Sequence, residues 1–358
     1  MSEIFLPQHG GNIYFFAEKF GLSPSQIIDL SSSVNPLIRN FLTLNEREFY
    51  EALSHYPDPE CQELKKAFAK KYALSEEYIL VGNGSFELLQ WLLLSLPSNT
   101  HIFIPEPTFI GYRKIISKRK NLFPHFNISL NPEEHLFALK RFLENSLSPK
   151  AVIICNPNNP TGLSFQKESL LSFITDYSNV IFIIDEAFIE FDEKNSLTTE
   201  ISKCSNLFIL RSLTKFYGLA GARAGFLISS NPLLKEIEAL KPSWSVNTIS
   251  QILAKRILED KTFREKSLEH FSKLKALFED KMKALGIEFL ESKTNFYLLR
   301  NIPKGYDFFL WLIQERHILV RNCYNFLGLS ERDIRVSLKE EDSLNLFCEA
   351  LKEWLKAL

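Results

Sequence analysis

The sequence predicts an α/β fold made of a large unit followed by a smaller α+β unit. Short apolar runs alternate with helix-like segments through the middle of the chain, which is typical of parallel strands joined by crossover helices. At 358 residues the chain is longer than one typical domain, and its pattern changes after about Leu240. We therefore expect the parallel sheet in the first part of the chain and a mixed unit in the second.

Six apolar runs are the candidate strands of the large unit. They are short and rich in Ile, Val, Leu and Phe, as buried strands of a parallel sheet are. The six are Tyr78–Val81, His101–Ile104, Ala151–Cys155, Val180–Ile184, Leu207–Leu210 and Gly225–Ile228.

Helix-like spacing occupies the segments between these runs. Asp58 and Pro59 could start a helix whose apolar face holds Leu64, Phe68 and Tyr72. The other predicted helices of this part are Phe86–Leu94, Leu136–Leu147 and Glu168–Tyr177.

The second unit is predicted to begin near Trp244. It opens with a long helical region and continues with short strands and two more helices. In order these are Thr248–Leu285 (helical), Asn295–Leu299 (strand), Asp307–Arg316 (helix), Ile318–Arg321 and Ile334–Leu338 (strands), and Glu341–Leu355 (helix).

Composition argues against several classes of partner. Forty-two basic and 43 acidic residues nearly balance, so a nucleic-acid partner is not expected. The most apolar stretch, Leu88–Leu96, is interrupted by Gln90 and is much shorter than the roughly 20 residues that span a bilayer. No basic signal segment follows Met1, and the five cysteines are scattered, so we expect a cytoplasmic protein with reduced thiols and no metal site.

Unusual polar residues follow the predicted strands at their carboxyl ends, where open parallel sheets bind ligands. Asn156–Gly162 follows one strand, Asp185–Phe188 the next, and Arg211–Lys215 a third. A fourth strand runs into the glycine turn Gly82–Ser85, which opens a helix.

Lys215 lies in the most informative of these segments. A lysine amine condenses with an aldehyde to form a Schiff base. Hydroxyls and a guanidinium hold a phosphate ester, and Ser212, Thr214 and Arg223 supply them here. An aldehyde that carries a phosphate is pyridoxal phosphate, so the segment predicts a site for that cofactor; a solvated lysine after a strand is the alternative for a lone Ser-x-x-Lys.

Asp185 ends a strand of pure hydrocarbon, where an aspartate needs a partner. A pyridinium N–H would be such a partner, and the carboxylate would keep the ring able to accept electrons. A helix cap or a metal ligand is the alternative, and the lysine thirty residues later favours the cofactor.

Four further residues gain meaning only beside Lys215. The glycine turn at Gly84 could present backbone amides to a phosphate, although it lacks the third glycine of a dinucleotide motif. Asn159 could donate to a phenolic oxygen, and Phe109 could stack on a ring. Taken alone, Asn159, Phe109 and Tyr56 would be a turn residue, a core residue and an ambiguous tyrosine.

Together these residues resemble the class I/II aminotransferase family, fold type I of the pyridoxal-phosphate enzymes, over nearly the whole chain. The resemblance implies a mostly parallel seven-stranded sheet in a large domain, residues 46–244, and a small domain, residues 245–358, on which residues 1–45 pack as an arm. It implies that Lys215 holds the cofactor, Asp185 its ring nitrogen and Asn159 its phenolic oxygen. The phosphate would contact Gly84, Ser85, Phe86, Ser212, Thr214 and Arg223.

The resemblance also implies a homodimer and a set of substrate residues. Tyr56 matches a tyrosine that reaches the phosphate in the neighbouring subunit, and Arg335 matches the arginine that binds a substrate anion. The remaining residues expected to bind substrate are His9, Gly11, Asn35, Asn159 and Arg321.

Two branches of the family compete, histidinol-phosphate aminotransferases and L-threonine-O-3-phosphate decarboxylases of cobalamin synthesis. His9-Gly10-Gly11-Asn12 and Trp244–Asn247 look like the decarboxylases, and Phe188 replaces a tyrosine usual in aminotransferases. We therefore expect O-phospho-L-threonine to be converted to aminopropanol phosphate and carbon dioxide. Ala222 departs from the usual Gly-Leu-Arg pattern, which we expect to affect packing.

Two alternatives stand beside this expectation. The first is an aminotransferase for histidinol phosphate or another amine, which would break the Cα–H bond with Lys215 as base. The second is a non-enzymatic ligand-sensing domain of a transcription regulator. Such a regulator needs a separate DNA-binding module, and His9-Gly10 stands almost at the start of this sequence, so we do not expect it.

Overall fold

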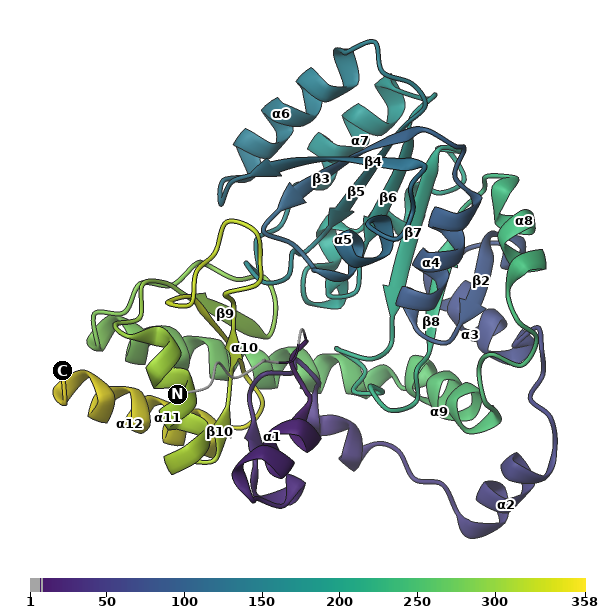
Figure 1. The fold of residues 1–358 in the computed structure, drawn as a ribbon. Coiled ribbons are helices and arrows are strands. Elements are labelled where there is room, and N and C mark those ends of the chain that lie inside the picture. Colours follow the sequence, from purple (N-terminus) through teal and green to yellow (C-terminus); the bar gives the residue numbers. More distant parts are fainter. Residues whose placement is uncertain (1–6, 8) are drawn as a thin grey trace.

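The computed structural model describes residue 7 and residues 9–358 (Figure 1). Its largest element is a seven-stranded sheet in the order β2-β8-β7-β6-β5-β3-β4. Only β8 runs antiparallel to its neighbours, so the predicted mostly parallel sheet is confirmed. The strands are β2 (Ile79–Gly82), β3 (Thr100–Glu106), β4 (Leu122–Ile128), β5 (Lys150–Cys155), β6 (Ile181–Asp185), β7 (Leu207–Ser212) and β8 (Gly225–Ile228).

The edge strand β4 is the one strand of this sheet that we did not predict. Its sequence contains Pro124, and Leu122 alone of its residues is fully buried. Proline is tolerated on an edge strand because one side of its backbone has no partner strand. A run of this kind lacks the continuous apolar pattern of the buried strands.

Helices cover both faces of the sheet and form a three-layer unit. One face packs against α3 (Gln62–Tyr72), α6 (Pro132–Glu144), α7 (Lys167–Asp176) and α9 (Thr248–Glu259). The other face packs against α4 (Ser85–Ser95), α5 (Gly111–Ile116) and α8 (Leu233–Leu240). The helix predicted to start at Asp58 begins instead at Gln62, whose backbone N–H donates to the Asp58 carboxylate at 2.8 Å.

A second core lies around a three-stranded antiparallel sheet in the order β11-β12-β9. Its strands are β9 (Phe296–Leu299), β11 (Arg321–Asn322) and β12 (Ile334–Ser337). The helices α10 (Lys261–Ala284), α11 (Gly305–Glu315) and α12 (Glu341–Lys356) pack on this core. Phe16 of α1 (Ile13–Phe20) and Leu30 belong to it too, and β1 (Ile28–Asp29) pairs with β10 (Ile318–Leu319).

Two predicted elements of this part are divided in the structure. The strand expected at Ile318–Arg321 is split at Val320 into β10 and β11, which lie in different sheets. The helical region Thr248–Leu285 breaks at Asp260, whose carboxylate caps α10 by accepting from Thr262 and Phe263 N–H.

Helix α10 connects the two cores. It runs from the side of α9, beneath the large sheet, to the second core (Figure 1). The short helix α2 (Glu46–Ser54), at the lower right, contacts α9 through an ion pair between Glu48 and Arg256. Helix α9 lies beyond the boundary predicted near Trp244, yet its Ala254 and Ile257 belong to the first core. The division of the chain at residue 244 stays a prediction.

Candidate active site

A cavity of about 470 Å³ lies at the carboxyl ends of the large-sheet strands. Most of the residues predicted for the site line it: His9, Gly84, Ser85, Phe86, Phe109, Asn159, Asp185, Ser212, Thr214, Lys215, Arg223 and Arg335. These residues come from the arm, from both halves of the large sheet and from β12. The sheet collects residues far apart in the sequence because the carboxyl ends of its parallel strands share one edge.

Lys215 lies on the loop that follows β7 and is half-buried at the cavity. Burial and the nearby charges of Arg335 and Arg223 lower the pKa of its amine to about 8. An amine with this pKa is partly uncharged near neutral pH, and the uncharged form is the nucleophile. The position of Lys215 therefore suits attack on an aldehyde.

Asp185 is buried at the end of β6 and also lines the cavity. Its Oδ2 accepts from the Tyr112 hydroxyl at 2.6 Å, and its Oδ1 accepts from Ala187 N–H at 3.1 Å. Burial raises the pKa of this carboxyl, and the two hydrogen bonds oppose that effect. A cationic ring nitrogen in the cavity would supply the opposite charge that a buried carboxylate needs.

The amino terminus of α4 and the loop after β7 form an anion cradle. Gly84 has φ +80° and a Cβ there would lie 2.7 Å from Arg223 Nη2, so only glycine lets the guanidinium approach this turn. The free backbone amides at the start of α4 favour an anion. Ser212 Oγ and Thr214 Oγ1 lie 2.8 Å apart beside the same cavity.

Arg335 carries positive charge into the cavity from β12. Its guanidinium donates to the Asn159 amide oxygen and the Ser31 carbonyl, and lies 5.0 Å from the centre of the Phe296 ring. Its Nε is buried and has no hydrogen-bond partner among the described residues. Burial lowers the pKa of Arg335 to about 10, so an anion bound here would stabilise its charged form.

Arg321 and His9 are two more residues predicted to bind substrate. Arg321 is opposite Arg335 in the register of β11 and β12, although it does not line the cavity. His9 is exposed on the arm, with its ring centre 5.8 Å from that of Phe109. Partial burial of its ring, followed by the charges of Arg321 and Lys114, lowers the pKa of His9.

Three predicted site residues lie away from the cavity. The side chain of Asn35 is buried and donates to the Phe216 carbonyl and to Ser267 Oγ, each at 2.8 Å. Its backbone N–H donates to the Lys215 carbonyl at 3.0 Å, so Asn35 holds the lysine loop. Gly11 N–H donates to Ser31 Oγ, and Tyr56 is 83% exposed with its ring 5.0 Å from that of Trp244.

The structure adds residues that we did not predict at the site. Tyr112 holds Asp185 from within α5, and Ser33, Leu89, Cys155 and Ala187 line the cavity. Tyr112 lies only three residues after Phe109. Nothing in the sequence of this short helix indicates that the tyrosine donates a hydrogen bond to a residue of β6. Phe188, expected to replace a tyrosine, also lines the cavity.

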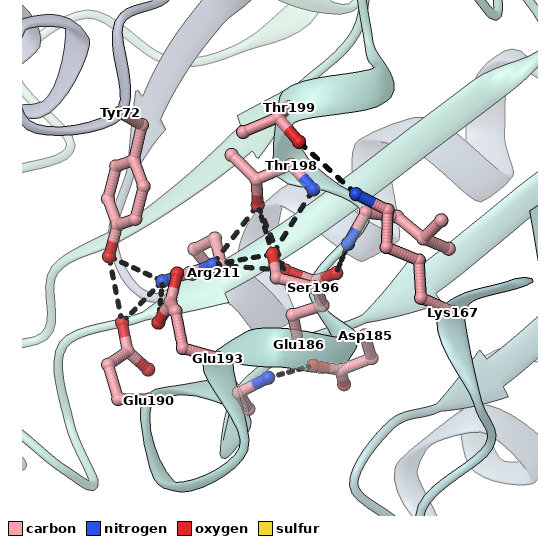
Figure 2. A network of polar contacts seen from close by, with 12 residues as sticks. Tyr72, Lys167, Asp185, Glu186, Glu190, Glu193, Ser196, Thr198, Thr199 and Arg211 are labelled. Atoms are coloured by element: carbon pink, nitrogen blue, oxygen red, sulfur yellow. Dashed lines mark hydrogen bonds and ion pairs between the residues drawn. The ribbon is translucent and has the colours of Figure 1, made fainter.

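A cluster of buried charges surrounds Arg211 at the ends of β6 and β7 (Figure 2). Successive residues of a strand face opposite ways, so Asp185 and Ser212 meet the cavity while Glu186 and Arg211 face the cluster. Arg211 is 3.0 Å from Glu186 and 2.8 Å from Glu190, and it donates to the hydroxyl of Tyr72. These contacts fix the ends of the two strands that carry Asp185 and the lysine loop.

Among the residues that the structure describes, no group of three or more His, Cys, Asp or Glu could hold a metal ion. Within the same described part, no helix combines the length and apolarity needed to cross a bilayer.

The sequence profile of the family "Aminotransferase class I and II" matches residues 19–351. The chain belongs to this family. Its cofactor is pyridoxal 5′-phosphate, and the cavity fits that group: an amine faces it at Lys215, a buried carboxylate at Asp185 and an anion cradle at Gly84.

Three known proteins illustrate the range of the family. The adenosylcobalamin biosynthesis bifunctional protein CobDQ of Leptospira interrogans is 31% identical over 93% of this chain, which spans only 39% of that longer protein. The solved histidinol-phosphate aminotransferase of Clostridium acetobutylicum is 30% identical, with a TM-score of 0.83 over 93% of this chain and 100% of its own. The L-threonine-O-3-phosphate decarboxylase of Porphyromonas gingivalis is 24% identical, with a TM-score of 0.80 over 92% of this chain and 100% of its own. At that identity the last comparison concerns the fold alone.

Proposed function

We propose that this protein decarboxylates O-phospho-L-threonine to aminopropanol phosphate and carbon dioxide. The observation that carries the proposal is the pair of arginines on β11 and β12, with a buried Nε on Arg335 that has no hydrogen-bond partner in the described part of the chain. O-phosphothreonine has two anionic groups, a carboxylate and a phosphate, whereas histidinol phosphate has only the phosphate. His9 over Phe109 and the similarity to a cobalamin-biosynthesis protein support the same choice.

Pyridoxal 5′-phosphate, when bound, supplies an aldehyde for amines and a ring that withdraws electrons from the substrate Cα. Asp185 would hold the ring nitrogen charged, and Phe109 would lie against the ring. Arg335 and Arg321 would fix the two substrate anions, and the bond at Cα that they hold perpendicular to the ring is the one that breaks. In decarboxylation the bond to the carboxylate breaks, carbon dioxide leaves, and Cα gains one proton, for which the Lys215 amine is the proposed donor.

A homodimer in a cytoplasmic setting completes the proposal. Tyr56 lies away from its own cavity and is exposed together with Trp244. We propose that Tyr56 contacts the phosphate in a second copy of the chain.

The test is to incubate the cofactor-loaded protein with O-phosphothreonine and to measure carbon dioxide and aminopropanol phosphate. The variant K215A should form neither product above background. Transfer of the amine to 2-oxoglutarate without gas would overturn the proposal and favour the aminotransferase alternative, which the likeness to the Clostridium acetobutylicum enzyme supports.

A further inference from the structure

One loop of the second core reaches across to the end of the large sheet. This crossing loop, residues 323–329, lies between β11 and β12 and approaches β3 and β4 (Figure 1). Gly328 packs so closely that a Cβ there would lie 2.5 Å from Ile128 Cγ2. Ile110 of the large unit shares an apolar cluster with Leu298, Cys323 and Phe326. The loop is therefore docked on the large unit through both backbone and side chains.

Arg113 of α5 provides the polar part of this contact. Its Nη2 donates to the Asn325 carbonyl at 2.9 Å. Its Nε lies 3.0 Å from Oε1 of Glu106, a carboxylate with no exposed surface. A buried carboxylate needs an opposite charge nearby, so Glu106 fixes where the guanidinium lies.

Glu106 is itself held beside the cavity. Its Oε2 accepts from Thr108 N–H at 2.7 Å, and Thr108 Oγ1 donates to the Asn158 amide oxygen at 2.7 Å. Phe109 and Asn159, which line the cavity, are the next residues along each segment. Arg113 is thus paired with a hydrogen-bonded part of the large unit that also places two cavity residues.

Asn325 links Arg113 to Arg321, a residue that we propose binds substrate. While its carbonyl accepts from Arg113, its side-chain oxygen accepts from Arg321 Nη2 at 2.6 Å. The Arg321 guanidinium also lies 5.0 Å from the centre of the Phe326 ring, in the same loop. A shift of Asn325 would therefore move the surroundings of Arg321 on two sides.

We propose that Arg113 is a positioning residue: it docks the crossing loop and, through Asn325, holds Arg321 in place for an anionic group of the substrate. The inference rests on the role of Arg321 in the proposed function. It concerns any doubly anionic substrate of this site, because Arg113 lies outside the cavity lining and reaches Arg321 through Asn325.

The test compares R113M, which keeps the length of the side chain and removes its donors, with K118M as a matched control. Lys118 is exposed just beyond the same helix. In the cofactor-loaded enzyme we expect hydrogen–deuterium exchange of the crossing loop to quicken about tenfold in R113M and to stay at the parent rate in K118M. We also expect KM for the substrate that the enzyme turns over to rise about tenfold in R113M, with kcat within about twofold and an unchanged cofactor absorption band.

R113K, which keeps the charge, should restore part of the loss and serves as the test if R113M does not fold. Parent-like loop exchange in these variants would overturn the docking role, and faster exchange with unchanged KM would overturn the positioning of Arg321. An enzyme that transfers amines and releases no carbon dioxide would defeat the proposed function but leave this test valid, because loop exchange and KM do not depend on which bond breaks.

Discussion

The amine of Lys215 is held in surroundings that disfavour its charge. Burial lowers its pKa from the ordinary 10.5 to about 8, and Arg335 and Arg223 add to the shift. The folded protein therefore releases this proton as pH rises through about 8, where a free lysine would still hold it. The uncharged amine that results is the form that reacts with an aldehyde.

We expect the apoprotein to recapture pyridoxal phosphate faster as pH rises from about 7 to about 9, with a midpoint near 8. The rate is measured from the absorbance of the bound cofactor in a stopped-flow instrument. In R335Q a neighbouring positive charge is gone, so the pKa of Lys215 should increase and the midpoint should move to higher pH. The control K118M should keep the parent midpoint; an R335Q midpoint at or below that of the parent would contradict this account.

Sequence reasoning at this scale found residues whose chemistry is rare at their positions. A lysine among hydroxyls and an aspartate after a hydrocarbon strand are unusual enough to be noticed, and both line the cavity. Tyr112 was not predicted, and the side chain of Asn35, which was expected to bind substrate, instead contacts Phe216 and Ser267. These contacts join residues far apart in the sequence, 73 positions for Tyr112–Asp185 and 181 for Asn35–Phe216. The sequence around a residue does not indicate a hydrogen bond to a partner so far away along the chain.

At the scale of elements, the amino terminus of α4 is the part of the cradle most sensitive to backbone change. Alanine at Gly84 would require φ +80° and a Cβ 2.7 Å from Arg223 Nη2. We expect G84A to weaken retention of pyridoxal phosphate at least about tenfold, because both the amides and the guanidinium must move. Equilibrium dialysis with the cofactor measures the effect.

Gly21 offers a matched control for G84A. It also has a positive φ, +66°, but a Cβ there would meet nothing within 4 Å. G21A should cost about 1 kcal/mol of stability from backbone strain alone and leave cofactor retention unchanged. Equal retention in G84A and G21A would show that the turn at Gly84 is not part of the cradle.

The buried charge cluster connects α3, β6 and β7 through one guanidinium. Arg211 is 1% exposed among Glu186, Glu190 and Tyr72 (Figure 2). R211M would leave buried carboxylates without their counter-charge, and we expect it to lower the free energy of unfolding by about 3–5 kcal/mol in urea titrations of the apoprotein.

The exposed pair of Arg39 and Glu340 provides the comparison for R211M. The Arg39 side chain is 69% exposed, and R39M should change the free energy of unfolding by less than about 1 kcal/mol. If R211M were as stable as R39M, the cluster would not hold the strand ends together.

Elements with a regular and complete pattern could be predicted from the sequence. The buried strands β5, β6 and β7 read as continuous apolar runs, and α6, α7 and α12 carry clear helical spacing. The edge strand β4 and the break between β10 and β11 could not be predicted. Whether such a segment forms a strand, and in which sheet, depends on the strand that pairs with it in the folded protein. The sequence of the segment itself does not identify that partner.

For the whole molecule, the proposed homodimer makes a quantitative prediction. K215A alone should be poorly active under all conditions. Y56A alone should be poorly active when the concentration of pyridoxal phosphate is limiting. In a mixed dimer, one site would combine Lys215 of the Y56A subunit with Tyr56 of the other subunit. Random association should therefore give about a quarter of the parent activity, and co-expression with two affinity tags measures it.

The subunit mass of 41.5 kDa lets light scattering check the assembly in the same samples. A mixture no more active than its components, in samples with twice the subunit mass, would mean that Tyr56 does not serve the neighbouring site.

The order in which the chain supplies the cavity has a consequence for how such a protein can diversify. Among the residues that line the cavity of one chain, those suited to pyridoxal phosphate lie between Gly84 and Arg223, whereas His9 and Arg335 come from near the two ends. Mutations near the two ends of the chain could therefore change the substrate specificity without altering the residues that hold the cofactor. A directed-evolution search for new activities should therefore first randomise the cavity residues that come from near the two termini.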